Sequence, residues 1–283
     1  MKLSKWFSLL FVALFVIVIV QSCSKDDELL IQSDQPSFSV RPDFETIDTR
    51  PPDVIAMSKI SEKDALPVEL VENNLKAGGK YALVIGISDY KGTANDLSYC
   101  DDDATDWKAR LVAEGYTVTS LLDLNATKAN IESAVNALAS LSAAGTEITL
   151  CYSGHGSRGN IVSTDLYYIS TSWFKTKFAN STSTKMFFCF DACQIGAAAT
   201  DLNKPGRVIA VASNRTSLSY DGDATMKNGV FTYYQMIGFD SQGLIYVEPD
   251  CQYACEQMIA WAKKVKVRVV PSYVDSYTGD FDL

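Results

Sequence analysis

The only histidine in the chain, His155, lies between two glycines in the stretch CYSGHGSRGN (151–160), and Cys193 lies further along in FDACQIG. An imidazole that titrates near neutral pH can accept the proton of a thiol, and the resulting thiolate is a strong nucleophile. The glycines leave the backbone free to aim the imidazole at a neighbouring loop. These residue types predict covalent catalysis in which His155 serves Cys193 as a base and then protonates a leaving amine.

Each of the two residues also has an ordinary structural interpretation. A lone histidine in a loop is commonly a polar surface residue, and a cysteine beside alanine commonly packs as a small hydrophobic residue. Their positions favour chemistry, because His155 follows the apolar run Glu147–Ser153 and Cys193 follows Lys185–Asp191. Successive parallel strands end at the same edge of a sheet, where α/β proteins bind their ligands. We therefore expect the two side chains to lie close together.

The elements that position them are typical of an α/β fold. Short apolar runs alternate with segments of helical periodicity after Gly79, and such runs suit a mainly parallel sheet covered by helices on both faces. The predicted strands are Tyr81–Ile87, Tyr116–Leu122, Glu147–Ser153, Lys185–Asp191, Arg207–Ser213 and a last strand, Val265–Val270. The predicted helices are Asp102–Glu114, Thr127–Leu141 with Thr127 as N-cap, Ser172–Ala179, Gly229–Ile237 and Cys251–Lys264.

The first residues read as an export signal. Lys2 and Lys5 precede the apolar run Trp6–Val20, which is shorter than the roughly 20 residues of a membrane span. The sequence VQSC that follows resembles a bacterial lipobox, in which Cys23 becomes lipidated, and the acidic SKDDE after it is similar to a lipoprotein surface-export signal. We therefore expect residues 1–22 to be a lipoprotein signal peptide and the protein to be anchored through Cys23 in the bacterial outer membrane, exposed at the cell surface.

Two further regions follow the signal peptide. Residues 23–79 hold five of the eight prolines and many polar residues, so they are interpreted as a tether or pro-segment with little helix or sheet. Residues 80–283 are long enough to form one globular domain.

The net charge and the spacing of the cysteines exclude some classes of partner and of structural site. The net charge of −9 argues against a nucleic-acid partner and favours a basic substrate. The six cysteines after Cys23 are irregularly spaced, which does not suit a disulfide framework. Cys251 and Cys255 share a helical face, but no second ligand pair accompanies them, so no metal site is predicted.

Over residues 80–239, the chain resembles the caspase-like cysteine peptidases, specifically their metacaspase-like branch. The resemblance is carried by YALVIGISDY, LSYCDDDA, YSGHGS, FDACQIG and GVFTYYQMIGF, in this order. It implies a caspase-like α/β/α sandwich and a cysteine endopeptidase with a His155–Cys193 dyad. Gln194 and Ile195 depart from the His-Ser pair that is frequent after the nucleophile, and Asp191 replaces the glutamine of true caspases.

The resemblance also implies polypeptide substrates with Arg or Lys at the cleavage site. An acidic primary pocket is carried onto Asp103 and Asp191, with Cys100 and Ser153 at neighbouring positions. Carboxylates facing a narrow pocket would pair with a guanidinium and exclude acidic side chains. For the adjacent Asp101 and Asp102, and as the alternative for Asp103, the plainer interpretation is a charged first turn of a helix.

Further roles follow from the same resemblance. The backbone N–H groups of Gly156 and Cys193 would form the oxyanion hole. Asp221 and Asp223 could contact a basic substrate or bind calcium, but acidic residues near a turn glycine are ordinary. The resemblance implies no required cofactor. Calcium, which some metacaspases need, stays an open alternative, although no matching aspartate cluster is found in the sequence.

Peptidases of this type are often made as zymogens, which makes basic residues candidate self-cleavage points. These are Arg50, Lys59, Lys76, Lys175, Lys177 and Lys185. Two other functions remain open: a catalytically silent caspase-fold scaffold, and a cysteine amidase that acts on cell-wall peptides.

Overall fold

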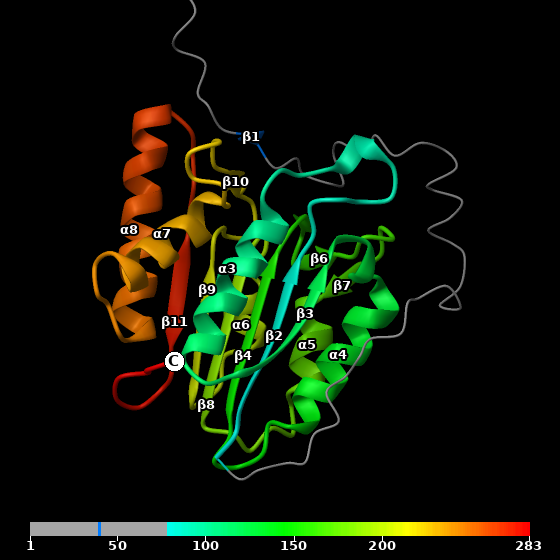
Figure 1. Ribbon diagram of the computed structural model, residues 1–283, viewed down its shortest axis with the longest axis vertical. Helices are drawn as coiled ribbons and strands as arrows, with labels where there is room; N and C mark the ends of the chain where they lie inside the picture. The colour runs from blue at the N-terminus through cyan, green and yellow to red at the C-terminus, as the bar shows by residue number, and fades with distance from the viewer. Residues whose placement is uncertain (1–38, 41–77) are drawn as a thin grey trace, which may run out of the picture. The chain divides into compact units, whose positions relative to one another are not determined.

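The computed structural model describes residues 39–40 and 78–283 (Figure 1). The signal peptide, the lipidation site Cys23 and the candidate cleavage points Arg50, Lys59 and Lys76 lie outside the described residues. Within the described ranges, no helix is both long and apolar enough to cross a membrane.

The central sheet has six strands in the order β11-β9-β8-β4-β2-β3. Five of them run parallel to their neighbours, and the edge strand β11 runs antiparallel to β9. The mainly parallel sheet predicted from the apolar runs is confirmed. The strands are β2 (Lys80–Gly86), β3 (Thr117–Leu122), β4 (Glu147–Ser153), β8 (Lys185–Asp191), β9 (Arg207–Val211) and β11 (Ser272–Asp275).

Helices cover both faces of this sheet (Figure 1). Because side chains alternate along a strand, each strand contributes to two cores. Leu83, Leu150 and Phe188 pack on one face, and Val84 and Phe187 pack on the other. The first face is covered by α4 (Lys128–Ser140), α5 (Thr171–Lys177) and α6 (Ala198–Asp201), and the second by α3 (Cys100–Ala113), α7 (Val230–Asp240) and α8 (Val247–Val265).

The N-cap predicted for α4 is confirmed, since the Thr127 hydroxyl accepts a hydrogen bond from the Asn130 amide at 3.2 Å. This bond satisfies one of the N–H groups that the first turn of a helix leaves unpaired.

The strand predicted at Val265–Val270 is wrong. Helix α8 runs on to Val265, and Lys266 ends it in a left-handed conformation with φ of 60°. Val267 and Val269 then pack against the core from an irregular segment, so their alternation reflects burial without strand pairing. The last strand, β11, begins only after Pro271.

Several short elements were not predicted. A three-stranded sheet of β5 (Gly156–Ser157), β6 (Asn160–Val162) and β7 (Tyr168–Ser170) follows His155 directly. Strand β1 (Ser39–Val40), within the proposed tether, pairs with β10 (Tyr220–Asp221). Two short 3-10 helices, η2 (Thr93–Asn95) and η3 (Asp123–Asn125), complete the described elements.

The strand order reverses between β2 and β4, because β2 is followed by β3 on one side while β4 lies on the other. In open α/β sheets, the crevice at such a switch point is the usual ligand site. Helix α3 starts directly over this edge. A Cβ added at Gly86, where β2 ends, would lie 2.2 Å from the Cys100 carbonyl oxygen, so only glycine allows this close approach.

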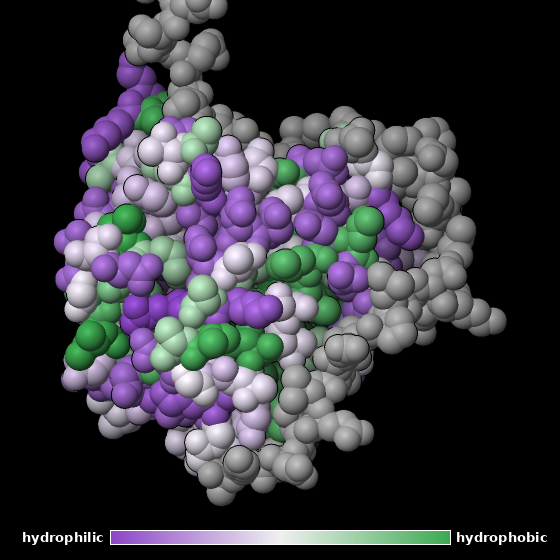
Figure 2. All heavy atoms as spheres, viewed as in Figure 1, coloured by the Kyte–Doolittle hydropathy of each residue, from purple (hydrophilic) through white to green (hydrophobic). Residues whose placement is uncertain are grey.

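The face shown in Figure 2 carries hydrophobic residues in separate patches among hydrophilic ones. Scattered exposed apolar residues of this kind are normal on a folded surface. The large exposed hydrophobic side chains among the described residues are Val112, Leu124, Tyr168, Ile245 and Ile259.

Candidate functional site

The backbone of His155 is held by two tyrosine hydroxyls just beyond β4. The His155 amide donates to the Tyr90 hydroxyl at 2.8 Å, and the Tyr152 hydroxyl donates to the His155 carbonyl at 2.7 Å. A Cβ at Gly154 would lie 2.5 Å from the Tyr152 oxygen and 2.7 Å from the Tyr90 oxygen. The glycine before the histidine is therefore needed for this packing.

The imidazole of His155 has a defined tautomer. Its Nε2 lies 2.7 Å from the Asn95 carbonyl oxygen, which can only accept a hydrogen bond. Nε2 therefore carries the proton, and Nδ1 is the basic nitrogen. The ring packs on Tyr90 with a centroid separation of 4.7 Å, and the residue is 0% exposed. The interpretation of His155 as a polar surface residue is wrong.

Cys193 lies two residues past the end of β8. Its Sγ accepts a hydrogen bond from the Ser219 amide at 3.2 Å and, as a thiol, donates to the Ser219 carbonyl oxygen at 3.7 Å. The next residue, Gln194, has φ of 51°, which is uncommon for a residue other than glycine and turns the chain sharply. Cys193 is 0% exposed.

The loops that carry His155 and Cys193 lie against each other. Strands β4 and β8 are parallel neighbours, with Ser153 opposite Asp191, and the Gly154 amide donates to the Asp191 carbonyl at 3.3 Å. A Cβ at Gly156 would lie 2.3 Å from the Cys193 carbonyl oxygen. The two candidate oxyanion residues, Gly156 and Cys193, are thus close through their backbones. The loops of His155 and Cys193 lie at the same end of the sheet, as their positions after successive strands predicted.

The two predicted pocket carboxylates are buried beside these loops. Asp103, in the first turn of α3, accepts hydrogen bonds from the Ser153 hydroxyl at 2.6 Å and the Gly229 amide at 2.8 Å. Asp191 accepts from the Ser219 hydroxyl at 2.6 Å. Since Ser219 also contacts the Cys193 sulfur, the hydrogen bonds of Asp191 extend to the candidate nucleophile.

A third carboxylate, Asp221, for which the sequence left a substrate contact, calcium binding or an ordinary turn open, is also buried. It accepts from the Ser98 amide at 3.1 Å, and the predicted pocket residue Cys100 directs its thiol at it, with Sγ 4.0 Å from Oδ1. Asp223 is different: it is half-buried and accepts from the amides of its own turn. The sequence flagged both as turn acids, and only the tertiary contact across the edge separates them.

Asp101 and Asp102 behave as an ordinary helix start. Asp102 is exposed and Asp101 is half-buried, and the Ser88 hydroxyl caps the helix by accepting from the Cys100 amide at 2.9 Å. Their negative charges complement the positive end of the helix dipole.

The remaining cysteines lie mostly in the core. Burial raises the pKa of the Cys189 and Cys251 thiols well above the ordinary value, and it raises the pKa of Cys255 to about 12. Cys151, Cys189, Cys251 and Cys255 are free thiols. Among the described residues, no group of three or more His, Cys, Asp or Glu side chains is arranged to hold a metal ion.

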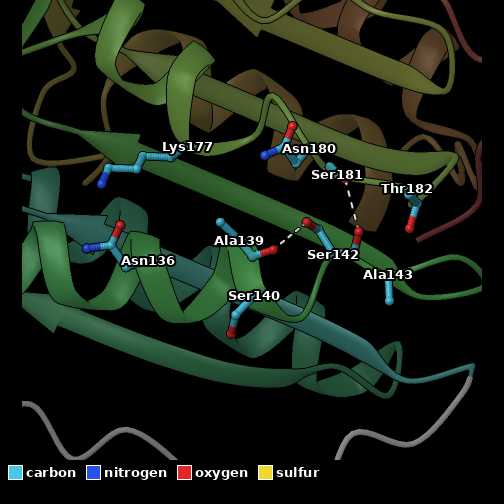
Figure 3. A pocket seen from close by; sticks show the side chains of 9 residues that line it. All are labelled: Asn136, Ala139, Ser140, Ser142, Ala143, Lys177, Asn180, Ser181 and Thr182. Atoms are coloured by element: carbon cyan, nitrogen blue, oxygen red, sulfur yellow. Dashed lines mark hydrogen bonds between the residues drawn. The ribbon is translucent and has the colours of Figure 1, made fainter.

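Figure 3 shows a separate pocket near the opposite edge of the sheet, where α4 ends and the chain approaches β8. The Ser181 hydroxyl donates to the Ser142 carbonyl across it at 3.1 Å. None of the candidate site residues lines this pocket, whose walls are formed by Asn136, Ala139, Ser140, Ser142, Ala143, Lys177, Asn180, Ser181 and Thr182.

The caspase domain family matches residues 79–244, a range that includes β2 to α7 and both strand-end loops. The chain belongs to the caspase domain family. The match spans His155, Cys193 and the three buried carboxylates of this caspase domain.

Further comparisons concern known proteins and structures. No curated protein matches the chain. Among solved structures, the caspase domain is similar to the crystal structure of protein GSU0716 from Geobacter sulfurreducens, with 18% identity and a TM-score of 0.54. The alignment covers 72% of this chain and 97% of that chain. At this identity the similarity shows a shared fold.

Proposed function

We propose that this caspase domain is a cysteine endopeptidase of the metacaspase-like branch that hydrolyses peptide bonds after Arg or Lys. The observation that carries the proposal is the hydrogen bond between the Ser219 hydroxyl and the buried Asp191, because the amide of the same Ser219 contacts the Cys193 sulfur. Two further buried carboxylates, Asp103 and Asp221, lie in neighbouring segments. Family membership supports the peptidase class, and the carboxylates support the specificity.

The proposed mechanism uses His155 and Cys193 as a dyad. Nδ1 of His155 takes the thiol proton, and the thiolate attacks the carbonyl carbon of the residue at the cleavage site. The N–H groups of Gly156 and Cys193 stabilise the oxyanion of the tetrahedral intermediate. The imidazolium then protonates the leaving amine, and water hydrolyses the thioester. The Asn95 carbonyl supports this cycle because it keeps the proton on Nε2 and leaves Nδ1 basic.

The proposed specificity follows from charge. Three carboxylates at one site attract a guanidinium or ammonium group and repel Asp or Glu side chains. Their described hydrogen bonds come from neutral hydroxyl, thiol and backbone donors, which hold the carboxylates in place without cancelling their charge.

The cellular setting belongs to the same proposal. The protein is a lipoprotein anchored through Cys23 in the outer membrane and made as a zymogen with a pro-segment within residues 23–79. Lys175 and Lys177 lie in α5, and Lys185 begins β8. Cleavage there requires local unfolding, which favours processing in the segment before the domain.

A panel of fluorogenic peptides with Arg, Lys, Asn or Asp at the cleaved position tests the activity. We expect turnover of the Arg and Lys peptides only, and its loss in His155→Ala without a change in the circular dichroism spectrum. Turnover after Asp or Asn alone would contradict the acidic pocket. No turnover with or without calcium and reductant would favour the scaffold, and turnover restricted to cell-wall peptides would favour the amidase.

N-terminal sequencing tests the zymogen. We expect the purified wild type to begin at a residue after one of Arg50, Lys59 or Lys76, and Cys193→Ala to keep the longer segment. Identical N-termini in both proteins would rule out self-processing.

A further inference from the structure

Ser219, the residue before β10, contacts both the candidate nucleophile and the predicted acidic pocket. Its backbone N–H donates to the Cys193 sulfur at 3.2 Å, and the Cys193 thiol donates to its carbonyl oxygen at 3.7 Å. Its hydroxyl donates to the Asp191 carboxylate at 2.6 Å. All three residues are at most 1% exposed. One buried serine thus connects the sulfur to a buried acidic residue.

The segment that carries Ser219 is attached to the nucleophile loop at another point as well. The Ser213 hydroxyl donates to the Ala192 carbonyl at 2.7 Å and accepts from the Ile195 amide at 3.1 Å. These bonds hold the backbone on both sides of Cys193. The bonds of Ser219 differ from them, because they reach the sulfur itself and a carboxylate.

Asp191 is held from a second side by the first turn of α7. The Thr232 amide and hydroxyl donate to Oδ2 of Asp191 at 3.1 and 3.0 Å, while Ser219 donates to Oδ1. Hydrogen bonds to a carboxylate are stronger than those between neutral groups. The contact with α7 fixes the carboxylate at the place where Ser219 meets it, so Asp191 is a firm anchor for the serine beside the thiol.

We infer that Ser219 is a positioning residue whose hydroxyl holds the Cys193 sulfur in place by linking it to the acidic pocket. The inference rests on the proposed function, which makes Cys193 the nucleophile and Asp191 part of the pocket. Asp191 then has two roles: its charge attracts the basic side chain of the substrate, and its Oδ1 holds the residue that contacts the sulfur. The residue that selects the substrate also fixes the geometry of the nucleophile.

Ser219→Ala removes the hydroxyl and leaves the backbone groups that contact the sulfur. We expect kcat for an Arg peptide to fall by about tenfold or more, because misplacement of a reacting atom slows the chemical step. KM should stay within about twofold of wild type, since the charge of Asp191 remains. A raised KM with unchanged kcat would make Ser219 a part of the binding pocket and contradict the inference.

Ser217→Ala is the matched control. The Ser217 hydroxyl accepts from the Asn214 amide of its own loop at 2.9 Å, so this variant removes a hydroxyl two residues away and keeps the bond between Ser219 and Asp191. We expect its kcat and KM to lie within about twofold of wild type. An equal loss of kcat in both variants would show a general loosening of the loop and overturn the specific role of Ser219.

Alkylation of Cys193 by iodoacetamide tests the link without a peptidase assay. Because Cys193 is 0% exposed, the reagent needs a local opening of the structure to reach the thiol, and the bond between Ser219 and Asp191 opposes that opening. We expect peptide mapping by mass spectrometry to show Cys193 alkylated at least about tenfold faster in Ser219→Ala than in wild type or Ser217→Ala. Slow alkylation of the buried Cys189 and Cys251 reports that the fold is retained.

The outcomes separate the link from the proposed function. Equal alkylation rates of Cys193 in all three proteins, with Cys189 unreactive, overturn the inference. Faster alkylation confined to Ser219→Ala, when the wild type hydrolyses no Arg or Lys peptide, upholds the link between sulfur and carboxylate and overturns the proposed function.

Discussion

Cys189 and Cys193 belong to two regions on either side of the end of β8, and these regions treat a thiol in opposite ways. Cys189 lies inside the strand, directs its sulfur at the Gln235 side-chain oxygen at 3.1 Å, and has a pKa raised by burial and by Cys151 nearby. Cys193 lies beyond the strand, where the Ser219 amide points at its sulfur and the His155 loop lies against its own. Because the residue type is the same, the different surroundings of the two thiols follow from their positions inside and beyond the strand.

Replacing each thiol in turn tests the difference between Cys189 and Cys193 most directly. We expect Cys193→Ser to lower kcat/KM for an Arg peptide by about 10³-fold or more, because a hydroxyl is a far weaker nucleophile, with little change in Tm. Cys189→Ser should keep the activity and lose about 1 kcal/mol of stability, since a hydroxyl costs more to bury than a thiol although the Gln235 side-chain oxygen can accept from it. If both variants lost activity while keeping their stability, the proposed difference between a structural Cys189 and a catalytic Cys193 would be wrong.

We expect the next largest loss of activity when a buried acidic residue of the proposed pocket is replaced, in contrast to an acidic residue of a nearby turn. We expect Asp191→Asn to lower kcat/KM for an Arg peptide by about 10²-fold, because the proposed pocket would lose one of its negative charges. Asp223→Asn is the matched control, and it should stay near wild type, since an amide oxygen still accepts from the turn amides. An equal loss of kcat/KM in both variants would indicate that the overall negative charge attracts the substrate, and would argue against a pocket at Asp191.

Asp250 is an acidic residue in the core, away from the proposed pocket. We expect it to make the stability of the folded protein depend on pH. It is fully buried on α8, neither of its oxygens has a hydrogen-bond partner among the described residues, and burial raises its pKa from 3.8 to about 9. Between these values the folded state keeps a proton that the unfolded chain has lost, so stability falls as pH rises.

Urea unfolding of Asp250→Asn at several pH values measures this effect. The stability of the variant relative to wild type should increase by up to about 1.4 kcal/mol per pH unit between about pH 4 and 9. Parallel stability curves for the two proteins would show that Asp250 does not titrate in this way. Peptidase activity, measured at one pH, should stay unchanged.

We expect the smallest change in activity and stability when Cys255, a half-buried cysteine of α8, is replaced. Because its pKa is raised to about 12, it remains protonated at pH 8 and should react slowly with iodoacetamide. Cys255→Ala should leave kcat/KM within about twofold and change stability by about 1 kcal/mol or less. Rapid labelling of Cys255 in the folded wild type would contradict this assignment.

The sequence predicted the parallel sheet well, because strands buried on both faces read as continuous apolar runs. It failed at Val265–Val270, where alternating valines resemble a strand but a left-handed Lys266 ends a helix that began earlier than predicted. Only the tertiary path of the chain distinguishes these two outcomes.

The positions of His155 and Cys193 at neighbouring strand ends were predictable, because each follows a buried apolar run. The pocket roles of Ser153, Asp103 and Asp191 came from the family resemblance and stay predictions. Asp221 could not be distinguished from Asp223 in the sequence, because its contact with Cys100 joins positions 121 residues apart. Strand β1 was missed because two residues carry no periodicity. Pairing partners so distant in sequence leave no local pattern.

The phenol of Tyr90 that holds the His155 amide has a consequence for how such a protein can change over time. The ring of this tyrosine belongs to the core, while its hydroxyl alone contacts the histidine backbone. Replacing Tyr90 by phenylalanine would thus remove only the hydroxyl oxygen, and the ring would still pack in the core. Selection could therefore adjust the alignment of the imidazole in small steps, while the sheet that carries it stays the same.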